Sequence, residues 1–245
     1  MIIQDKVVVI TGSSSGIGKA IAELFAREGA KIVLNSRHNE KGGLHLVKEL
    51  EGQTEVIYQR ADVGTIDGAH QLLDKAVERF GHIDILINNA GVGVEGDFLK
   101  LSEADIDQIL HDNLLSAVYC SQYAIALMQK HEGIAKIINT SSNRGWEFGA
   151  RAPIYGLSKA GINSLTRTLA KNYSPNILVN AVAPGFTKTP NYDAFDPKMV
   201  EAFLDQTKLH RWIQVEEVAE AFLFLAKNDA ITGEVIYVDA GFRLK

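Results

Sequence analysis

Short runs of consecutive hydrophobic, largely β-branched residues alternate with amphipathic segments along almost the whole chain. The runs predict strands, because a parallel strand that is covered on both faces reads as near-continuous apolar sequence. The segments between them carry apolar residues three or four positions apart and predict helices. The expected strands are 6–11, 31–36, 55–59, 83–88, 136–140, 177–182 and 234–238, and the expected helices are 16–29, 39–51, 65–80, 102–130, 153–171, 197–208 and 215–227.

This alternation predicts an α/β fold with one doubly wound, seven-stranded parallel sheet and helices on both of its faces. The sequence contains no internal repeat, low-complexity tract or linker, so we expect one domain over residues 1–245. Residues 184–196 form the one long irregular stretch, and we interpret it as the start of a loop over a site rather than a domain boundary.

Composition narrows the class of protein. The chain has 245 residues, of which 46% are hydrophobic, and its net charge of −5 argues against a general nucleic-acid binder. Its single cysteine, Cys120, excludes an internal disulfide and fits a reducing compartment. We find neither a signal peptide nor an apolar run approaching the roughly 20 residues that span a bilayer. We therefore expect a cytoplasmic protein with no membrane partner.

Candidate chemistry is found first in the helix expected over 153–171. Tyr155 and Lys159 are four residues apart, so their side chains lie on the same helical face. A neighbouring ammonium favours the phenolate, so we expect a lowered pKa for Tyr155 and a role in proton donation. The same spacing also occurs on ordinary solvated helix faces.

A second candidate site lies between the first expected strand and helix. Residues 11–18 read TGSSSGIG, with glycines at Gly12, Gly16 and Gly18. Glycines permit a tight turn and close approach of the backbone, and the following helix N-terminus can bind a phosphate. A purely structural strand–helix turn is the alternative. The turn is not a P-loop, because no Gly-Lys-Ser/Thr follows.

Several motifs in the same order make the chain similar to the compact form of the short-chain dehydrogenase/reductase family. The resemblance spans about residues 6–241 and implies a Rossmann fold with hydride transfer between NAD(P) and a ketone or secondary alcohol. The motifs are TGSSSGIG, Asp62, the run Asn88-Asn89-Ala90-Gly91, Asn113, Ser142, Tyr155, Lys159, Asn180 and Pro184-Gly185.

The resemblance also implies the roles of four catalytic residues. Ser142 would donate its hydroxyl to the substrate carbonyl, and Tyr155 would protonate the developing alkoxide. Lys159 would lower the proton affinity of the phenol and bind the nicotinamide ribose. Asn113 would open its helix for a proton relay to Lys159, although a polar residue on the solvent face is the alternative. Ser141 lies one residue farther from Tyr155 than Ser142 does and is rejected.

The end of the second strand indicates the cofactor. An acidic residue there binds the ribose hydroxyl of NAD, whereas a basic one accommodates the additional phosphate of NADP. Ser36 and Arg37 occupy this position, so we expect NADP rather than NAD. Arg37 could instead be a plain surface charge. A second basic residue of the family, just before the second glycine of the turn, is absent here, because Ser15 occupies that position. The expected cofactor-binding residues are Gly12, Ser14, Ser15, Gly16, Ile17, Gly18, Ser36, Arg37, Asp62, Val63, Asn88, Ala90, Gly91, Tyr155, Lys159, Pro184, Gly185, Thr187 and Thr189.

Two of these positions could instead have a purely structural role. Asn88 could only steady the end of its strand, and Thr189 could be an ordinary loop cap. The histidines are scattered without metal-ligand spacing, and we expect no catalytic metal.

The substrate is expected to bind in loops 92–101, 143–152 and 186–212. These loops carry the aromatic residues Trp146, Phe148, Phe186, Tyr192, Phe195, Phe203 and Trp212. The whole pattern is similar to 3-oxoacyl-[acyl-carrier-protein] reductases, which would make an acyl-carrier-protein thioester the substrate. The unusual RGWEF segment at 144–148 and the short turn at 228–234 depart from that pattern, so a sugar, polyol or steroid-like ketone stays open.

A dinucleotide-binding regulator without catalytic activity is the alternative from another class. The intact set of Ser142, Tyr155 and Lys159 argues against it. Compact members of the family assemble as homotetramers or homodimers, and we expect the same here. Small residues at Gly156, Ser158, Ala160 and Gly161 would allow close packing of helices between subunits.

Overall fold

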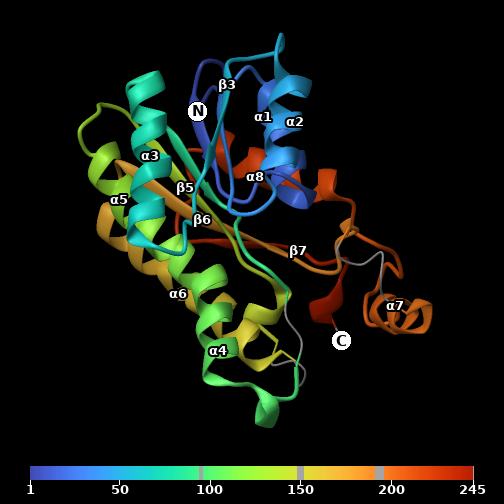
Figure 1. The fold of residues 1–245 in the computed structure, drawn as a ribbon. Helices are drawn as coiled ribbons and strands as arrows, with labels where there is room; N and C mark the ends of the chain where they lie inside the picture. Colours follow the sequence, from blue (N-terminus) through green and yellow to red (C-terminus); the bar gives the residue numbers. More distant parts are fainter. Residues whose placement is uncertain (94–95, 148–151, 191–195, 245) are drawn as a thin grey trace.

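The computed structural model describes residues 1–93, 96–147, 152–190 and 196–244. They form a parallel sheet of seven strands with helices on both faces, which confirms the predicted fold class (Figure 1). The strands are β1 (Val7–Ile10), β2 (Lys31–Ser36), β3 (Val56–Arg60), β4 (Ile85–Asn88), β5 (Ala135–Thr140), β6 (Ile177–Pro184) and β7 (Val235–Val238). The helices are α1 (Gly16–Arg27), α2 (Glu40–Leu50), α3 (Ile66–Phe80), α4 (Glu103–Leu110), α5 (Ser116–Met128), α6 (Pro153–Tyr173), α7 (Pro197–Leu204) and α8 (Val215–Lys227).

The strand order is β3-β2-β1-β4-β5-β6-β7, with every neighbouring pair parallel. Val8 of β1 pairs with Ile32 of β2 on one side and with Ile85 of β4 on the other. The chain reverses its direction of winding at this point. Open α/β sheets bind ligands in the crevice beyond the carboxyl ends of such central strands.

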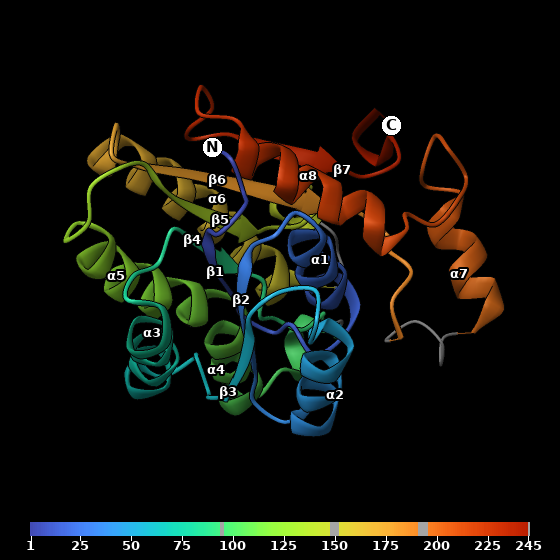
Figure 2. The same ribbon diagram turned by 90° about the horizontal axis from the view of Figure 1, so that it is seen from above.

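The helices cover the sheet in two layers. One layer contains α1, α2 and α8, and the other contains α3, α4, α5 and α6 (Figure 2). The strand side chains that face the layers are fully buried, as the continuous VVVI of β1 and ILIN of β4 predict. The buried apolar faces fix the positions of the strand ends, and with them the loops that form the candidate site.

The expected single helix over 102–130 is interrupted. α4 passes directly into a π-helical segment, His111–Leu115, and this continues as α5. Ser102 begins α4 and forms a capping box with Asp105. The expected helix at 197–208 ends earlier, at Leu204, and the irregular segment after β6 pairs Thr187 with Ile213.

No helix among the described residues is long and apolar enough to cross a membrane.

Candidate active site

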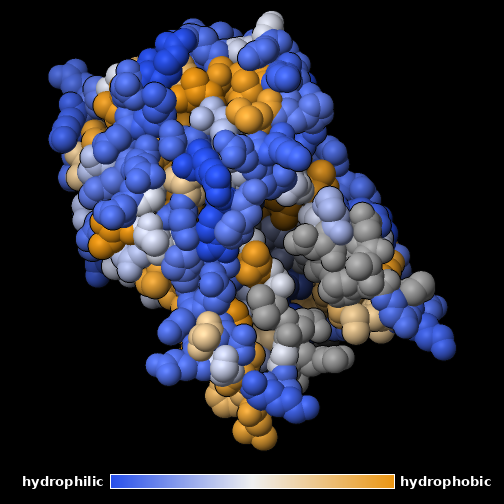
Figure 3. Space-filling model, in the orientation of Figure 1, coloured by the Kyte–Doolittle hydropathy of each residue, from blue (hydrophilic) through white to orange (hydrophobic). Residues whose placement is uncertain are grey.

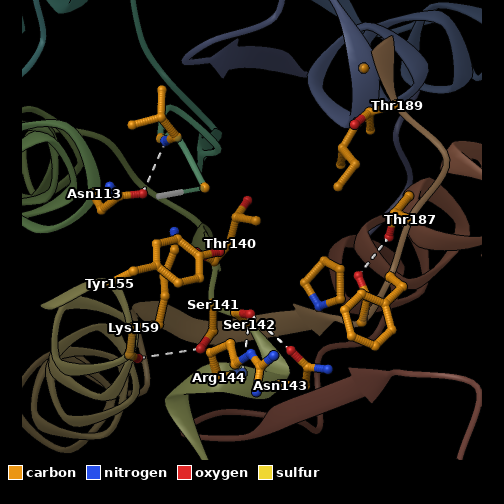
Figure 4. Close-up of a pocket in the computed structure, with 18 of the residues that line it drawn as sticks. Asn113, Thr140, Ser141, Ser142, Asn143, Arg144, Tyr155, Lys159, Thr187 and Thr189 are labelled. Carbon is orange, nitrogen blue, oxygen red and sulfur yellow. Dashed lines mark hydrogen bonds between the residues drawn. The ribbon is translucent and has the colours of Figure 1, made fainter. Parts of the chain in front are cut away.

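A cleft of about 760 Å³ opens beyond the carboxyl ends of β1, β4, β5 and β6 (Figure 4). It brings together fourteen of the residues selected from the sequence. They are Gly12, Ser15, Gly16, Ile17, Gly18, Gly91, Asn113, Ser142, Tyr155, Lys159, Pro184, Gly185, Thr187 and Thr189. The surrounding surface is largely hydrophilic on this side of the molecule (Figure 3). Hydrophobic patches also appear on this face, one of them at the lower tip (Figure 3), and Phe98 and Leu99 are among the exposed apolar side chains of the molecule.

The turn at residues 11–18, called the glycine turn below, requires glycine at two of its positions for steric reasons. Gly12 has φ +62°, and a Cβ there would lie 2.8 Å from the Cα of Ala90. A Cβ on Gly18 would overlap the Gly12 carbonyl and lie 2.5 Å from Nδ2 of Asn89. No side-chain hydrogen bond caps α1 at Ser15, which leaves its first N–H groups available beside the cleft. A phosphate group fits this turn and helix N-terminus.

Two residues outside the predicted set hold the turn against the loop after β4. Asn89 Nδ2 donates to the carbonyls of Thr11 (3.1 Å) and Gly12 (3.0 Å). In return, Oγ1 of Thr11 accepts from the backbone N–H groups of Asn89 and Ala90, each at 2.9 Å. The Asn-Asn-Ala-Gly run could have indicated Asn89, but the role of Thr11 depends on the pairing of β1 with β4.

Asn88 points away from the cleft and into the sheet. Its Nδ2 donates to Ser121 Oγ at 2.9 Å and to Asn139 Oδ1 at 2.8 Å, which joins β4 to α5 and β5. Of the two roles considered for Asn88, this geometry supports steadying of the strand end. Ala90 packs against the core beside α3 and α5 rather than lining the cleft.

The side-chain hydrogen bonds of Asn113 account for the π-helical segment in which it lies. Its Nδ2 donates to the Ile109 carbonyl at 3.0 Å, the acceptor that a regular helix gives to a backbone N–H. Its Oδ1 accepts from the Val92 N–H at 3.1 Å (Figure 4). The side chain is 1% exposed, so the solvent-face alternative is wrong. Asn113 thus opens the backbone of the helix, as the resemblance implied, and fastens the loop after β4.

Ser142, Tyr155 and Lys159 meet at the far end of the cleft from the glycine turn. Lys159 Nζ lies 5.7 Å from the centre of the Tyr155 ring and donates to the Thr140 carbonyl at 2.9 Å. Ser142 Oγ donates to Asn143 Oδ1 and accepts from the Arg144 N–H, both at 3.2 Å. Ser141 Oγ instead donates to Asn163 on α6 at 2.6 Å, which agrees with its rejection.

Burial dominates the electrostatics of this end. It raises the pKa of Tyr155, while the Ser142 hydroxyl and the positive charge of Arg144 act to lower it. Burial also lowers the pKa of Lys159 to about 8. The expectation that Lys159 lowers the pKa of the Tyr155 phenol is therefore wrong for this structure. The reason is that the ammonium is directed to Thr140, and desolvation of the phenolate outweighs the opposing interactions.

The residues expected at the adenine end form a separate charged cluster beyond the cleft lining. Arg37 donates in a bidentate manner to Asp112, at 2.6 and 3.1 Å, and lies 3.6 Å from Asp62. This pairing raises the pKa of Arg37. Burial acts to raise the pKa of Asp112, but hydrogen bonds from Arg37 and His111 outweigh it, and the net pKa is lowered. Arg37 is thus held in ion pairs with two carboxylates of its own chain.

The remaining residues predicted at this end are held by local contacts. Ser36 shares a hydrogen bond of 2.8 Å with the Tyr58 hydroxyl, and Asp62 accepts from the Gly64 N–H at 3.1 Å. Val63 is buried in the core beside α3. The carbonyl of Ser14 accepts from Asn39 Nδ2 at 3.4 Å, next to the glycine turn.

The segment after β6 closes over the glycine turn. Thr187 Oγ1 donates to the Gly185 carbonyl at 3.1 Å. Thr189 lies next to Gly16, because a Cβ added to Gly16 would be 3.4 Å from the methyl carbon of Thr189. The two strand ends, β1 and β6, therefore bring the predicted phosphate and nicotinamide contacts to one cavity.

An aromatic cluster borders the cleft beside the segment that follows β6. The Phe186 and Phe203 rings stack at 4.7 Å between centroids, and Phe242 meets Phe186 edge-on at 5.6 Å. Trp212 packs against this cluster, whereas Trp146 is 61% exposed. Phe242 has no sequence signal, because only the return of the C-terminal segment brings it here. Phe148, Tyr192 and Phe195 lie outside the described residues.

The described part of the chain contains no group of three or more His, Cys, Asp or Glu side chains that could hold a metal ion.

Comparison with known proteins defines the class to which this fold and site belong. The model of a family described as enoyl-(acyl carrier protein) reductase matches residues 12–243. The 3-oxoacyl-[acyl-carrier-protein] reductase of Thermotoga maritima is 37% identical, over 98% of this chain and 99% of the relative. The chain belongs to the short-chain dehydrogenase/reductase family, and it is an oxidoreductase of that type.

Solved structures agree with this assignment. A Sinorhizobium meliloti protein assigned to the short-chain alcohol dehydrogenases has a TM-score of 0.94 and 29% identity, with full coverage of both chains. A short-chain dehydrogenase from Burkholderia cenocepacia, in complex with NADP, has a TM-score of 0.91 and 27% identity, covering 99% of this chain and all of the other. The site is therefore that of a nicotinamide-dinucleotide oxidoreductase.

Proposed function

We propose that this protein reduces a ketone to a secondary alcohol with NADPH, and catalyses the reverse oxidation. The observation that carries this proposal is the arrangement of one cleft. The glycine turn and the start of α1 form one end, and Ser142, Tyr155 and Lys159 form the other. A bound dinucleotide would span these two ends, with its reactive ring beside the three side chains.

Residues of this chain would hold the cofactor at several points. Gly12, Gly16 and Gly18 allow the tight packing of the turn against its neighbours, and the N–H groups at the start of α1 would bind the pyrophosphate. Thr187 and Thr189 would bind the phosphates and the nicotinamide amide from the opposite wall. Arg37 would pair with the 2′-phosphate of NADP, which is the basis for preferring NADP to NAD. When bound, the cofactor supplies the hydride.

The protein would supply the proton and hold the carbonyl. Ser142 would donate a hydrogen bond to the carbonyl oxygen, and Tyr155 would transfer its proton to that oxygen as negative charge develops. The raised pKa of Tyr155 keeps the phenol protonated and ready to donate. Lys159, next to it, would bind the nicotinamide ribose, and Asn113 would keep the helix open for proton resupply.

Tyr155→Phe tests this assignment directly. Removal of one hydroxyl should lower kcat by about 10²- to 10⁴-fold, the usual contribution of a positioned general acid. NADPH binding, measured by fluorescence titration, should change little. Near-complete retention of activity by the variant would refute the mechanism. NADPH binding without turnover of any ketone in the unmodified protein would instead favour the regulator.

A second, more specific candidate is reduction of a 3-oxoacyl thioester on an acyl carrier protein. It is favoured by the 37% identity to the Thermotoga maritima reductase of that name. A panel with a β-keto thioester, an enoyl thioester, sugars, polyols and cyclic ketones separates the candidates. A preference for the enoyl thioester would point to reduction of a carbon–carbon bond and away from this proposal.

We further propose that residues 1–245 act as one catalytic domain in a cytoplasmic homotetramer or homodimer. The small residues of α6 do not all remain available for a subunit contact. Ser158 is fully buried, and a Cβ on Gly161 would lie 3.0 Å from Leu114 of the same chain. Light scattering of the purified protein measures the assembly size.

A further inference from the structure

Arg144 lies in the wall of the cleft, two residues after Ser142. Its side chain is only 18% exposed. The guanidinium carbon lies 5.7 Å from the centre of the Phe242 ring, which holds the planar group in place. Figure 4 shows Arg144 beside Ser142 and on the side of the cleft opposite Thr189. Thr189 is the residue that lies against Gly16 of the glycine turn. Its charge is therefore placed at the substrate end rather than at the phosphates.

The guanidinium of Arg144 has N–H donors that no described residue accepts. A guanidinium carries five N–H donors. Its ion-pair neighbour is Glu147, whose Oε2 lies 3.6 Å from Nη1, beyond hydrogen-bond distance. Among the described residues, its side chain donates no hydrogen bond. A mostly buried cation in this state is stabilised when an anionic acceptor enters the cleft.

Asn143 contributes a second, independent donor at the same place. It also lines the cleft, and its side chain is 4% exposed. Its Oδ1 accepts from Ser142, but its Nδ2 is buried without a hydrogen-bond partner in the described part of the chain. Buried donors without acceptors are uncommon in folded proteins. The pair of donors thus points to a ligand group with acceptor oxygens.

We propose that Arg144 and Asn143 bind a carboxylate of the substrate, so that the natural ketone is an oxo acid and the alcohol is a hydroxy acid. This inference rests on the proposed function. A ligand group with a single negative charge fits this site, because Glu147 already offsets part of the charge of Arg144. A phosphate dianion would bring two charges to the same pair of donors. Phe186 and Phe203 would cover the carbon chain of the substrate.

The reaction balances with the groups already named. The oxo acid, NADPH and one proton give the hydroxy acid and NADP⁺. A C–H bond forms at the carbonyl carbon while the carbon–oxygen π pair moves to oxygen, which takes the proton of Tyr155. The carboxylate undergoes no chemistry and serves only to orient the carbonyl.

The test compares oxo acids of increasing length with their methyl esters, using NADPH oxidation as the readout. The unmodified protein should show a kcat/KM for its best oxo acid at least about tenfold above that of the ester. Arg144→Gln should lower this acid-to-ester ratio by about 10- to 100-fold, the effect of losing one charge-assisted hydrogen bond. Asn143→Asp retains an acceptor for Ser142 but adds a like charge, and should lower the same ratio.

Arg79→Gln is the matched control. Arg79 also lies over a phenylalanine, at 5.1 Å from the Phe80 ring, but on α3 and outside the cleft lining. It should leave the ratio unchanged. NADPH titration of each variant verifies that the cofactor end is intact.

The outcomes separate this inference from the proposed function. Reduction of neutral ketones or a β-keto thioester without a preference for acids would overturn the inference and leave the function standing. An acid-to-ester ratio that Arg144→Gln does not change would also overturn it, as would a preference for phosphorylated ketones over carboxylates. Failure to reduce any ketone would overturn the proposed function itself.

Discussion

Replacement of Lys159 by methionine should stabilise the fold at neutral pH while it abolishes turnover. Lys159 is 3% exposed, and its burial lowers the pKa from 10.5 to about 8. A lowered pKa means that folding disfavours the ammonium, so the charged lysine costs stability. Methionine has a similar length and no charge to desolvate.

The magnitude follows from the shift. Each pKa unit corresponds to about 1.4 kcal/mol, so the cost of the buried ammonium is about 3 kcal/mol below pH 8. The variant also loses the 2.9 Å hydrogen bond to the Thr140 carbonyl, which offsets about 1–2 kcal/mol. The net gain at pH 7 is therefore about 1–2 kcal/mol, or roughly 2–8 °C in Tm for a chain of this length.

The pH dependence distinguishes this effect from a general change in packing. The unfolded state binds the proton more tightly than the folded state, so the cost is present in full below pH 8 and disappears as pH rises to 10.5. Relative to the unmodified protein, the advantage of Lys159→Met should shrink by about 3 kcal/mol across that window.

Denaturant unfolding at several values between pH 7 and pH 10.5 measures this difference. Lys171→Met, at an exposed position on the same helix, controls for removal of a lysine from α6. A stability difference that does not change with pH, or that grows as pH rises, would refute the reasoning from desolvation.

Three further changes test the cofactor end and the π-helical segment. Arg37→Gln should lower kcat/KM with NADPH by about 10- to 100-fold and leave it nearly unchanged with NADH, because one charge-assisted contact is lost; equal losses with both would exclude a contact to the 2′-phosphate. Gly18→Ala should weaken NADPH binding at least about tenfold in a fluorescence titration, since the Cβ overlaps the turn; normal binding would contradict the steric argument. Asn113→Leu should destabilise the fold by about 2 kcal/mol in urea unfolding, because the Ile109 carbonyl and the Val92 N–H lose their partner; an unchanged midpoint would show that the π-helical segment does not need the amide.

The positions of the strands and most helices could be predicted because their signals are local. β1 and β4 are buried on both sides; β1 reads as an unbroken apolar run, β4 as an apolar run that ends at Asn88, and α3 repeats its apolar residues every three or four positions. Hydrophobic spacing predicted one continuous helix over 102–130 and not the π-helical segment at His111–Leu115; only the family resemblance implied an opening at Asn113. Its cause is a side chain that replaces a backbone donor, and hydrophobic spacing carries no trace of such an exchange.

Partners of charged side chains were the least predictable feature of the site. Arg37 is bound by Asp112, 75 residues further along the chain. The sequence predicts the wrong direction for the Tyr155 pKa, because spacing indicates that Lys159 is near but not that it binds Thr140. Likewise, α6 uses Ser158 and Gly161 within its own chain, which their small size alone does not indicate.

By itself, the sequence determined the order of strands and helices, the glycine turn and the shared face of Tyr155 and Lys159. These features depend on the backbone geometry of a few neighbouring residues, so short patterns are enough to specify them. Only the tertiary structure decided which side chains meet Arg37, how far burial shifts the pKa values of Tyr155 and Lys159, and that Arg144 and Phe242 meet at the cleft. Desolvation and contact arise between segments that are far apart in the chain, and the packing of the whole sheet sets those distances.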